Sequence, residues 1–139
     1  VDYPTRDAEV SMLKLHRQSV KPPTAITSGS QILEIQNQIE QVHITDELQG
    51  YIVDLIRSSR EHPDLLLGGS PRAAINLLKA ARVHALIHGR PYMTHEDVQR
   101  VSVPVLSHRL ILRPEAEMDG RKTVSIIEEL IAQIPIRRA

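Results

Sequence analysis

Aliphatic residues recur at helical spacing along most of this sequence, and this periodicity restricts the fold more than any other feature. It is clearest after Thr45, where apolar side chains follow one another at i, i+3, i+4, i+7 and i+8. Such spacing puts them on one face of a helix from Asp46 to about Arg60, and the Thr45 hydroxyl can cap its first turn. The residues on this face are Leu48, Tyr51, Ile52, Leu55 and Ile56.

A second helix is predicted between Ser70 and Gly89. Ser70 is a favourable N-cap, Pro71 suits the first helical position because no hydrogen bond is lost there, and Gly89 closes the segment. Most of its circumference is apolar, which is typical of a helix in the middle of a bundle. Its polar stripe consists of Arg72, Asn76, Lys79 and Arg82.

Two helices are predicted nearer the start of the chain, one over residues 5–16 with Thr5 as N-cap and one over residues 31–41 with Ser30 as N-cap. Between them, residues 17–30 contain two prolines, a glycine and several Ser and Thr residues. This composition favours an extended connector over a packed element.

The last third of the chain predicts two further helices. Thr94 can cap the first, with the Asp97 carboxylate reaching back to the cap amide, and Pro104 is expected to restart or kink it. The second begins at Thr123 and ends near Pro135.

Strand signals are slight, because only residues 42–44 and 91–93 could form a short pairing and no alternation of strands and helices appears. With 41% hydrophobic residues but neither Phe nor Trp, the core must be aliphatic. The sequence therefore predicts an all-α fold, a helical bundle of about four to five helices with at most one minimal two-stranded pairing.

Composition excludes several classes of function. The absence of Cys excludes disulfide frameworks, Cys-ligated zinc and thiol nucleophiles, and it is compatible with a reducing cytosol. The longest apolar runs have three residues, far below the ~20 that span a bilayer, so no membrane span is expected. Zero net charge and 2% aromatic residues provide neither the electrostatic footprint nor the stacking platform of a nucleic-acid binder.

Two pairs of residues suggest metal chemistry, and their surroundings argue against it. His84 and His88 lie at i and i+4, but the zinc protease pattern needs a Glu directly after the first His, and no third ligand is suggested. Asp46 and Glu47 resemble the acid pair that follows a buried strand in P-loop ATPases, but Thr45 before them makes a capped helix start the simpler explanation. No metal site is predicted.

The segment Gly68-Gly69-Ser70-Pro71-Arg72 is the strongest candidate for a binding site. Its glycines let the backbone come close to another body, and the free amides of a helix start form a partly positive end suited to an anion. Arg72 in the first turn is unfavourable against the helix dipole by a few tenths to ~1 kcal/mol, so a compensating partner is expected. An Arg fork matches phosphate and carboxylate alike, so a phosphate contact and a structural salt bridge both stay open.

The same segment belongs to a longer resemblance. The runs from His62 to Ala73 and from Leu77 to Arg82 resemble the C-terminal lid of MoxR-family AAA+ ATPases, and the resemblance covers nearly the whole chain. Its further parts are Tyr3-Pro4 with Asp7, Tyr92 to Val98, Val105 to Leu110 and Arg113 to Ala116.

The resemblance implies a hexameric ATP-driven machine in which ATP, with Mg, lies between a large α/β subdomain and this helical lid. Arg72 matches the family's sensor 2 arginine, which approaches the γ-phosphate, and is the expected catalytic residue. Gly68, Gly69, Ser70 and Pro71 complete the expected nucleotide-binding segment.

The resemblance also implies a division of the chain. Residues 1–16 would end the large AAA+ subdomain, residues 17–30 would be a linker and hinge, and residues 31–139 would form the lid with a C-terminal tail helix. The implied partners are the chain's own large subdomain, further copies in a homo-hexamer and a client that the sequence does not identify, all in the cytoplasm. Because the Walker motifs would precede Val1, this chain alone is expected to hydrolyse nothing.

The main alternative is a stand-alone helical interaction module that binds a partner helix and no nucleotide. It explains the composition equally well but not the glycine-rich helix start at residues 68–72. A set of arginines near the C-terminus is expected to be a solvated face or a set of subunit contacts. They are Arg109, Arg113, Arg121, Arg137 and Arg138.

Overall fold

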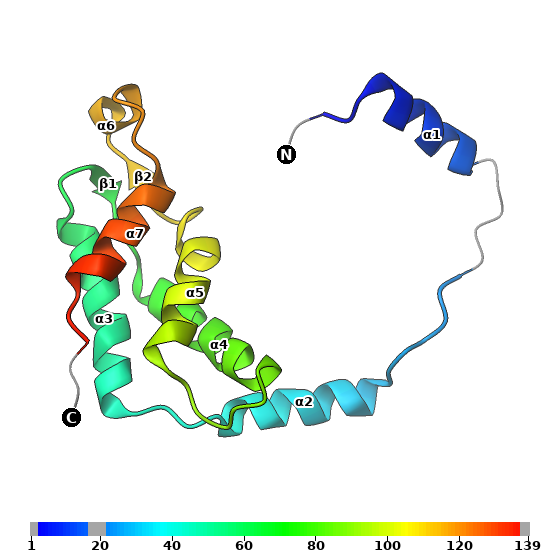
Figure 1. Cartoon of the computed structure of the whole chain (residues 1–139), viewed down its shortest axis with the longest axis horizontal. Helices are drawn as coiled ribbons and strands as arrows, with labels where there is room; N and C mark the ends of the chain where they lie inside the picture. Colours follow the sequence, from blue (N-terminus) through cyan, green and yellow to red (C-terminus); the bar gives the residue numbers. More distant parts are fainter. Residues whose placement is uncertain (1–2, 17–21, 137–139) are drawn as a thin grey trace. The chain divides into compact units, whose positions relative to one another are not determined.

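The computed structural model describes residues 3–16 and 22–136 of the chain. The chain forms two compact units, Val1–Ile32 and Leu33–Ala139, and their boundary falls inside a helix. Figure 1 shows the elements in chain order from α1 to α7. The described residues are mostly helical, with seven helices and one small antiparallel sheet, so the predicted fold class is confirmed.

Helix α1 (Arg6–His16) begins after Thr5, as predicted, and the Thr5 hydroxyl accepts a hydrogen bond of 3.4 Å from the Ala8 amide. None of its described side chains is buried within this structure. Of the predicted connector, residues 17–21 lie outside the described part of the chain, and residues 22–28 form no regular element.

Helix α2 (Gly29–Gln41) begins two residues before the predicted start, and its N-cap is Ser28 rather than Ser30. The Ser28 hydroxyl accepts a hydrogen bond from the Gln31 amide at 3.3 Å, and the Gln31 side-chain oxygen accepts one from the Ser28 amide at 2.8 Å. This reciprocal pair is a capping box, which needs a Gln or Glu three residues after the cap. Ser28 has Gln31 at that position, whereas Ser30 has a Leu, which explains the correction.

Helix α3 (Asp46–Glu61) confirms the clearest periodicity in the sequence. The Thr45 hydroxyl accepts a hydrogen bond of 3.3 Å from the Leu48 amide, which makes Thr45 the N-cap. All five residues of the predicted apolar face are buried: Leu48, Tyr51, Ile52, Leu55 and Ile56.

Helix α4 (Pro71–Ile87) has the predicted bounds, but it is buried on one face only. It packs against α3 and α5 through Ala73, Leu77, Ala81 and Ala85, all fully buried. The opposite face is exposed, because Ile75 keeps 52% of its surface. The expected position in the middle of a bundle is therefore wrong: small alanines let α4 pack closely on one face, Leu78 and Leu86 are partly buried beside it, and Ile75 and Ile87 stay exposed.

Helix α5 (His95–Leu106) continues through Pro104 and ends at Leu106, so the expected restart before His108 does not occur. Pro104 and Arg100 both lie on the exposed side of the helix. Water can therefore bond the Arg100 carbonyl that loses its amide partner at Pro104, and the helix tolerates the proline.

The C-terminal part adds the short helix α6 (Pro114–Met118), which was not predicted, and α7 (Thr123–Gln133), which was. Helix α7 packs against α3 and α5. The core between these helices is almost entirely aliphatic, as expected, with Tyr51 as its aromatic member among the described residues. Its largest fully buried apolar side chains are Leu48, Leu55, Ile56, Leu77, Val98, Leu106, Ile126 and Ile127.

Two short strand pairings complete the fold. The predicted one appears as a single parallel bridge between His43 and Tyr92, and the His43 amide donates to the Pro91 carbonyl at 2.8 Å. Strand β1 (Leu65–Leu67) pairs antiparallel with β2 (Ile111–Leu112), which was not predicted because such short runs show no alternation of polar and apolar residues. None of the described helices is long and apolar enough to cross a membrane.

Candidate functional site

The start of helix α4 is built as the sequence predicts. Ser70 has extended backbone angles, and its hydroxyl and carbonyl oxygens accept hydrogen bonds from the Ala73 amide at 3.4 and 2.9 Å. Pro71 occupies the first position of the helix. Arg72 follows in the first turn, and its side chain is exposed.

The two glycines before this helix, Gly68 and Gly69, pack closely against helix α3. A Cβ atom on Gly68 would lie 2.6 Å from the Cα and backbone nitrogen of Arg60, a distance that real Cβ contacts do not show. A Cβ on Gly69 would lie 3.0 Å from Ile56 Cδ1. The sequence predicted that the backbone at these glycines comes close to another group. In the structure that group is the backbone of α3.

Two neighbouring residues on α3 hold this segment in place. The buried Ser59 hydroxyl accepts a hydrogen bond of 2.8 Å from the Gly69 amide and donates one of 2.6 Å to the Ile56 carbonyl. Arg60 Nε donates to the Gly69 carbonyl at 2.7 Å. Sequence reasoning missed both residues, because nothing local to positions 59 and 60 indicates a contact ten residues away.

Within the described residues, Arg72 has no carboxylate partner with which to form a structural salt bridge. No carboxylate of residues 3–16 or 22–136 lies within salt-bridge distance of its guanidinium group. Other arginines of the described chain do find such partners, for example Arg90 and Arg121. The sequence left two alternatives open for Arg72, a phosphate contact and a structural salt bridge. The salt bridge has no partner in the part of the chain that the structure describes.

A buried carboxylate, that of Asp97, joins α4 to α5 near the C-terminal end of α4. Asp97 is fully buried, and its carboxylate accepts two hydrogen bonds from Arg90, at 2.5 and 2.7 Å, and lies 2.7 Å from His84 Nδ1. It also accepts from the Thr94 amide at 2.7 Å, which confirms the predicted reach to the cap. The contacts with Arg90 and His84 were not predicted.

These contacts decide the ionisation of Asp97. Burial by itself raises the pKa of the Asp97 carboxyl, but the hydrogen bonds from Arg90, His84 and Thr94 outweigh it and hold that pKa well below its usual value of 3.8. The carboxylate is therefore charged at neutral pH, and the guanidinium of Arg90 compensates it.

His84, His88 and Arg121, which the sequence also singled out, form hydrogen bonds or ion pairs with residues of this chain. His84 and His88 do face the same way, with ring centroids 4.3 Å apart, but His84 Nδ1 meets Asp97 and His88 Nδ1 lies 2.8 Å from the His84 carbonyl. Arg121 binds Asp64 at 2.9 Å and Glu129 at 2.7 and 2.8 Å. The expectation of a solvated face or subunit contacts is therefore wrong for Arg121, which links residues far apart in its own unit.

The remaining arginines of that set are placed as follows. Arg109 and Arg113 are exposed, and each Nε donates to a backbone carbonyl, that of Val105 at 3.0 Å and that of Pro63 at 2.9 Å. Arg137 and Arg138 lie outside the described residues.

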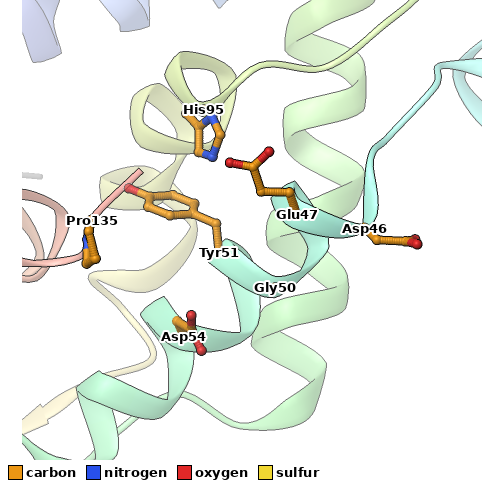
Figure 2. Close-up of a pocket in the computed structure, with 7 residues that line it drawn as sticks. All are labelled: Asp46, Glu47, Gly50, Tyr51, Asp54, His95 and Pro135. Carbon is orange, nitrogen blue, oxygen red and sulfur yellow. The ribbon is translucent and has the colours of Figure 1, made fainter. Parts of the chain in front are cut away.

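A cavity of about 180 Å³ lies between the first turns of α3 and α5 and is lined in part by Glu47, Tyr51 and His95. Figure 2 shows the Glu47 carboxylate turned toward the His95 ring, with Asp46 pointing away from both. Glu47 Oε1 and His95 Nε2 are buried atoms without a hydrogen-bond partner among the described residues. Because Asp46 and Glu47 diverge, they do not form the convergent acid pair of a P-loop ATPase.

Comparison with known proteins places this architecture in a family. Residues 57–130 match the AAA lid domain, and this span is more than half of the chain and includes Arg72. The chain is 31% identical over 99% of its length to the uncharacterised protein YeaC of Bacillus subtilis, covering 44% of that protein. It is 29% identical over 98% of its length to the chaperone MoxR1 of Mycobacterium tuberculosis, covering 38% of it.

A solved structure shows the same fold. It is a crystal structure of a protein from Cytophaga hutchinsonii with a provisional ATPase assignment, 32% identical and with a TM-score of 0.81 over 99% of this chain and 45% of that one. The chain thus spans less than half the length of the relatives it matches. It belongs to the AAA lid domain family, in the form found in MoxR-family AAA+ ATPases.

Proposed function

We propose that this chain is the lid that brings Arg72, as a sensor 2 arginine, to the γ-phosphate of ATP held mainly by the large AAA subdomain. The observation that carries the proposal is the setting of Arg72: exposed, in the first turn of α4, and without a carboxylate partner among the described residues. An arginine placed against the helix dipole without an internal partner is available to an external anion, which would offset the unfavourable interaction with the dipole. The family match favours this function over a stand-alone interaction module.

The residues around Arg72 fit a phosphate group. A guanidinium fork matches phosphate oxygens, and the start of α4 adds the partial positive charge of its dipole. The Gly69 amide already donates to Ser59, so Gly68 and Gly69 would contribute by positioning the helix start. Bound ATP, with its Mg ion, supplies the phosphoryl group, and Arg72 would stabilise the negative charge that develops on it.

The same contact would report the state of the nucleotide. Loss of the γ-phosphate removes the partner of Arg72, which releases the lid, and residues 17–30 would act as the hinge between the end of the large subdomain and the lid. The motion would pass to neighbouring subunits of a cytoplasmic homo-hexamer and to a client protein, in line with the chaperone name of the Mycobacterium tuberculosis relative. The isolated chain is expected to have no ATPase activity.

The test is the Arg72→Ala substitution in the full-length protein. ATP turnover should fall by at least ~100-fold, because arginine contacts contribute 10³–10⁵ in related phosphoryl transfers. The matched control is Arg100→Ala, since Arg100 is also an exposed arginine, and its one ion pair among the described residues is with Glu96. Unchanged turnover of Arg72→Ala in a correctly assembled protein would remove the sensor assignment.

A further inference from the structure

Two histidines at the C-terminal end of α4 have one ring nitrogen each fixed by a hydrogen bond. His84 Nδ1 lies 2.7 Å from a carboxylate oxygen of Asp97, and His88 Nδ1 lies 2.8 Å from the His84 carbonyl. Both oxygens can only accept a proton, because Arg90 keeps the Asp97 carboxyl ionised and a carbonyl has no proton to give. Each Nδ1 atom therefore carries the proton and donates it.

This arrangement leaves the second nitrogen of each ring free for a ligand. In a neutral imidazole one nitrogen donates and the other carries a lone pair, so Nε2 is the lone-pair atom in both rings. Neither Nε2 atom forms a hydrogen bond with another described residue. Metal-binding histidines almost always donate their other ring nitrogen to a carboxylate, a backbone carbonyl or water. His84 and His88 thus have the tautomer that metal binding requires.

The two rings also lie close enough to share one ion. They are four residues apart on the same side of the helix, and their centroids are 4.3 Å apart. Two imidazoles that bind one ion at about 2.0–2.1 Å from each nitrogen place their centroids about 4.5–5 Å apart. A small rotation of the exposed His88 side chain closes this difference.

The surroundings of the pair leave room for an ion and for further ligands. Both histidines line an open cavity of about 620 Å³, together with Arg90, Glu96 and Arg100. The two arginines do not exclude a cation, because Asp97 compensates the charge of Arg90 and Glu96 that of Arg100. Within the described residues no third His, Cys, Asp or Glu side chain converges on the pair. Water molecules would therefore fill the other coordination positions.

We propose that His84 and His88 bind a divalent late transition-metal ion, Ni²⁺ or Cu²⁺, through their Nε2 atoms. Imidazole suits these ions, and two nitrogens completed by water match their tetragonal geometry better than the closed four-ligand site of structural zinc. Mg²⁺ prefers oxygen ligands and does not compete. The sequence predicted no metal site, because spacing alone does not show the contacts that fix each Nδ1. The proposal is independent of the role of Arg72.

Titration calorimetry of the full-length protein with Ni²⁺ tests the site, in excess Mg²⁺ and without nucleotide. His88→Ala should weaken Ni²⁺ binding by about tenfold or more, since even the loss of a residue that only supports a ligand costs 10–100-fold. His88 is exposed, and the one hydrogen bond of its side chain among the described residues is to the His84 carbonyl, so this variant should fold. The matched control is His108→Ala, because His108 is also exposed and does not line the cavity.

Electron paramagnetic resonance with Cu²⁺ identifies the ligands. At a Cu²⁺ concentration below that of the protein, the spectrum of the wild type should show coupling to two imidazole nitrogens. The spectrum of His88→Ala should show at most one, and that of His108→Ala should match the wild type. Unchanged Ni²⁺ affinity and an unchanged spectrum in His88→Ala would overturn the proposal. So would equal losses in His88→Ala and His108→Ala, because they would show binding to exposed histidines in general.

Discussion

Asp97 shows how a single side chain can combine a local and a long-range task. Its contact with the Thr94 amide belongs to the helix start and follows from spacing along the sequence. Its contacts with His84 and Arg90 tie that helix start to the end of α4 and to the loop after it. Removing the charge of Asp97 should therefore affect the whole unit rather than one helix end.

We expect Asp97→Asn to lower the free energy of unfolding at pH 7 by about 2–4 kcal/mol, because it leaves the partly buried Arg90 guanidinium without its carboxylate. Urea unfolding followed by circular dichroism measures the change. Glu96→Gln is the matched control, since the side chain of Glu96 is 70% exposed, and it should change stability little. Equal effects of the two substitutions would contradict the structural role of Asp97.

The same substitution has a pH signature. The pKa of Asp97 is lower in the folded chain than the usual 3.8 of an unfolded one, so the stability it provides is present above that value and is lost as pH falls below it. The difference between wild type and Asp97→Asn should therefore shrink as the pH falls below about 4. A difference that grows between pH 4 and pH 2 would contradict a lowered pKa of Asp97.

Gly68 provides a second test at the level of one residue. Gly68→Ala should destabilise the chain by about 1–3 kcal/mol, because its Cβ would meet the backbone of α3 and the two segments must separate. Gly50→Ala is the control: Gly50 lies within α3, and a Cβ there meets nothing within 4 Å. It should stabilise by about 0.5–1 kcal/mol through helix propensity. Thermal unfolding of the two variants should show shifts of opposite sign.

At the scale of elements, two helices with similar N-caps differ in how much of their surface they bury. Helices α2 and α3 both begin at a capped residue, Ser28 and Thr45. Helix α3 buries a whole face in the core, whereas none of the residues of α2 is buried in the described structure. The stability of α3 is therefore shared with its unit, while that of α2 is local.

Two cap substitutions test this difference. Thr45→Ala should lower the global free energy of unfolding by about 1 kcal/mol, the usual cost of a lost N-cap. Ser28→Ala should leave global unfolding unchanged and instead increase amide hydrogen exchange in the first turn of α2. A global destabilisation by Ser28→Ala as large as that of Thr45→Ala would show that α2 is packed.

At the scale of the whole molecule, stability should reside in the second unit. Deletion of residues 1–26 should leave the urea midpoint and m-value unchanged, because the described side chains of α1 are not buried and the Ser28 cap remains. Deletion of residues 123–139 should abolish cooperative unfolding, because α7 contributes Ile126, Ile127 and Leu130 to the core. A large fall in the midpoint after the first deletion would contradict this division.

Sequence by itself determined where most helices begin and which residues face the core, as for Thr45 with Leu48 and for Ser70 with Pro71. These features depend on a 3.6-residue period and on caps within four residues, so they are visible locally. It also singled out Arg72, whose role at a nucleotide remains a prediction. The unpredicted strands and the run of α5 through Pro104 lie where local signals are short or ambiguous.

Only the tertiary structure decided the features that join distant residues. It showed that Gly68 meets the backbone of Arg60 and that Arg90 and His84 share Asp97. Each depends on a distance between segments that the chain brings together when it packs. No periodicity or motif of one segment contains that distance, which is why these contacts emerge with the fold.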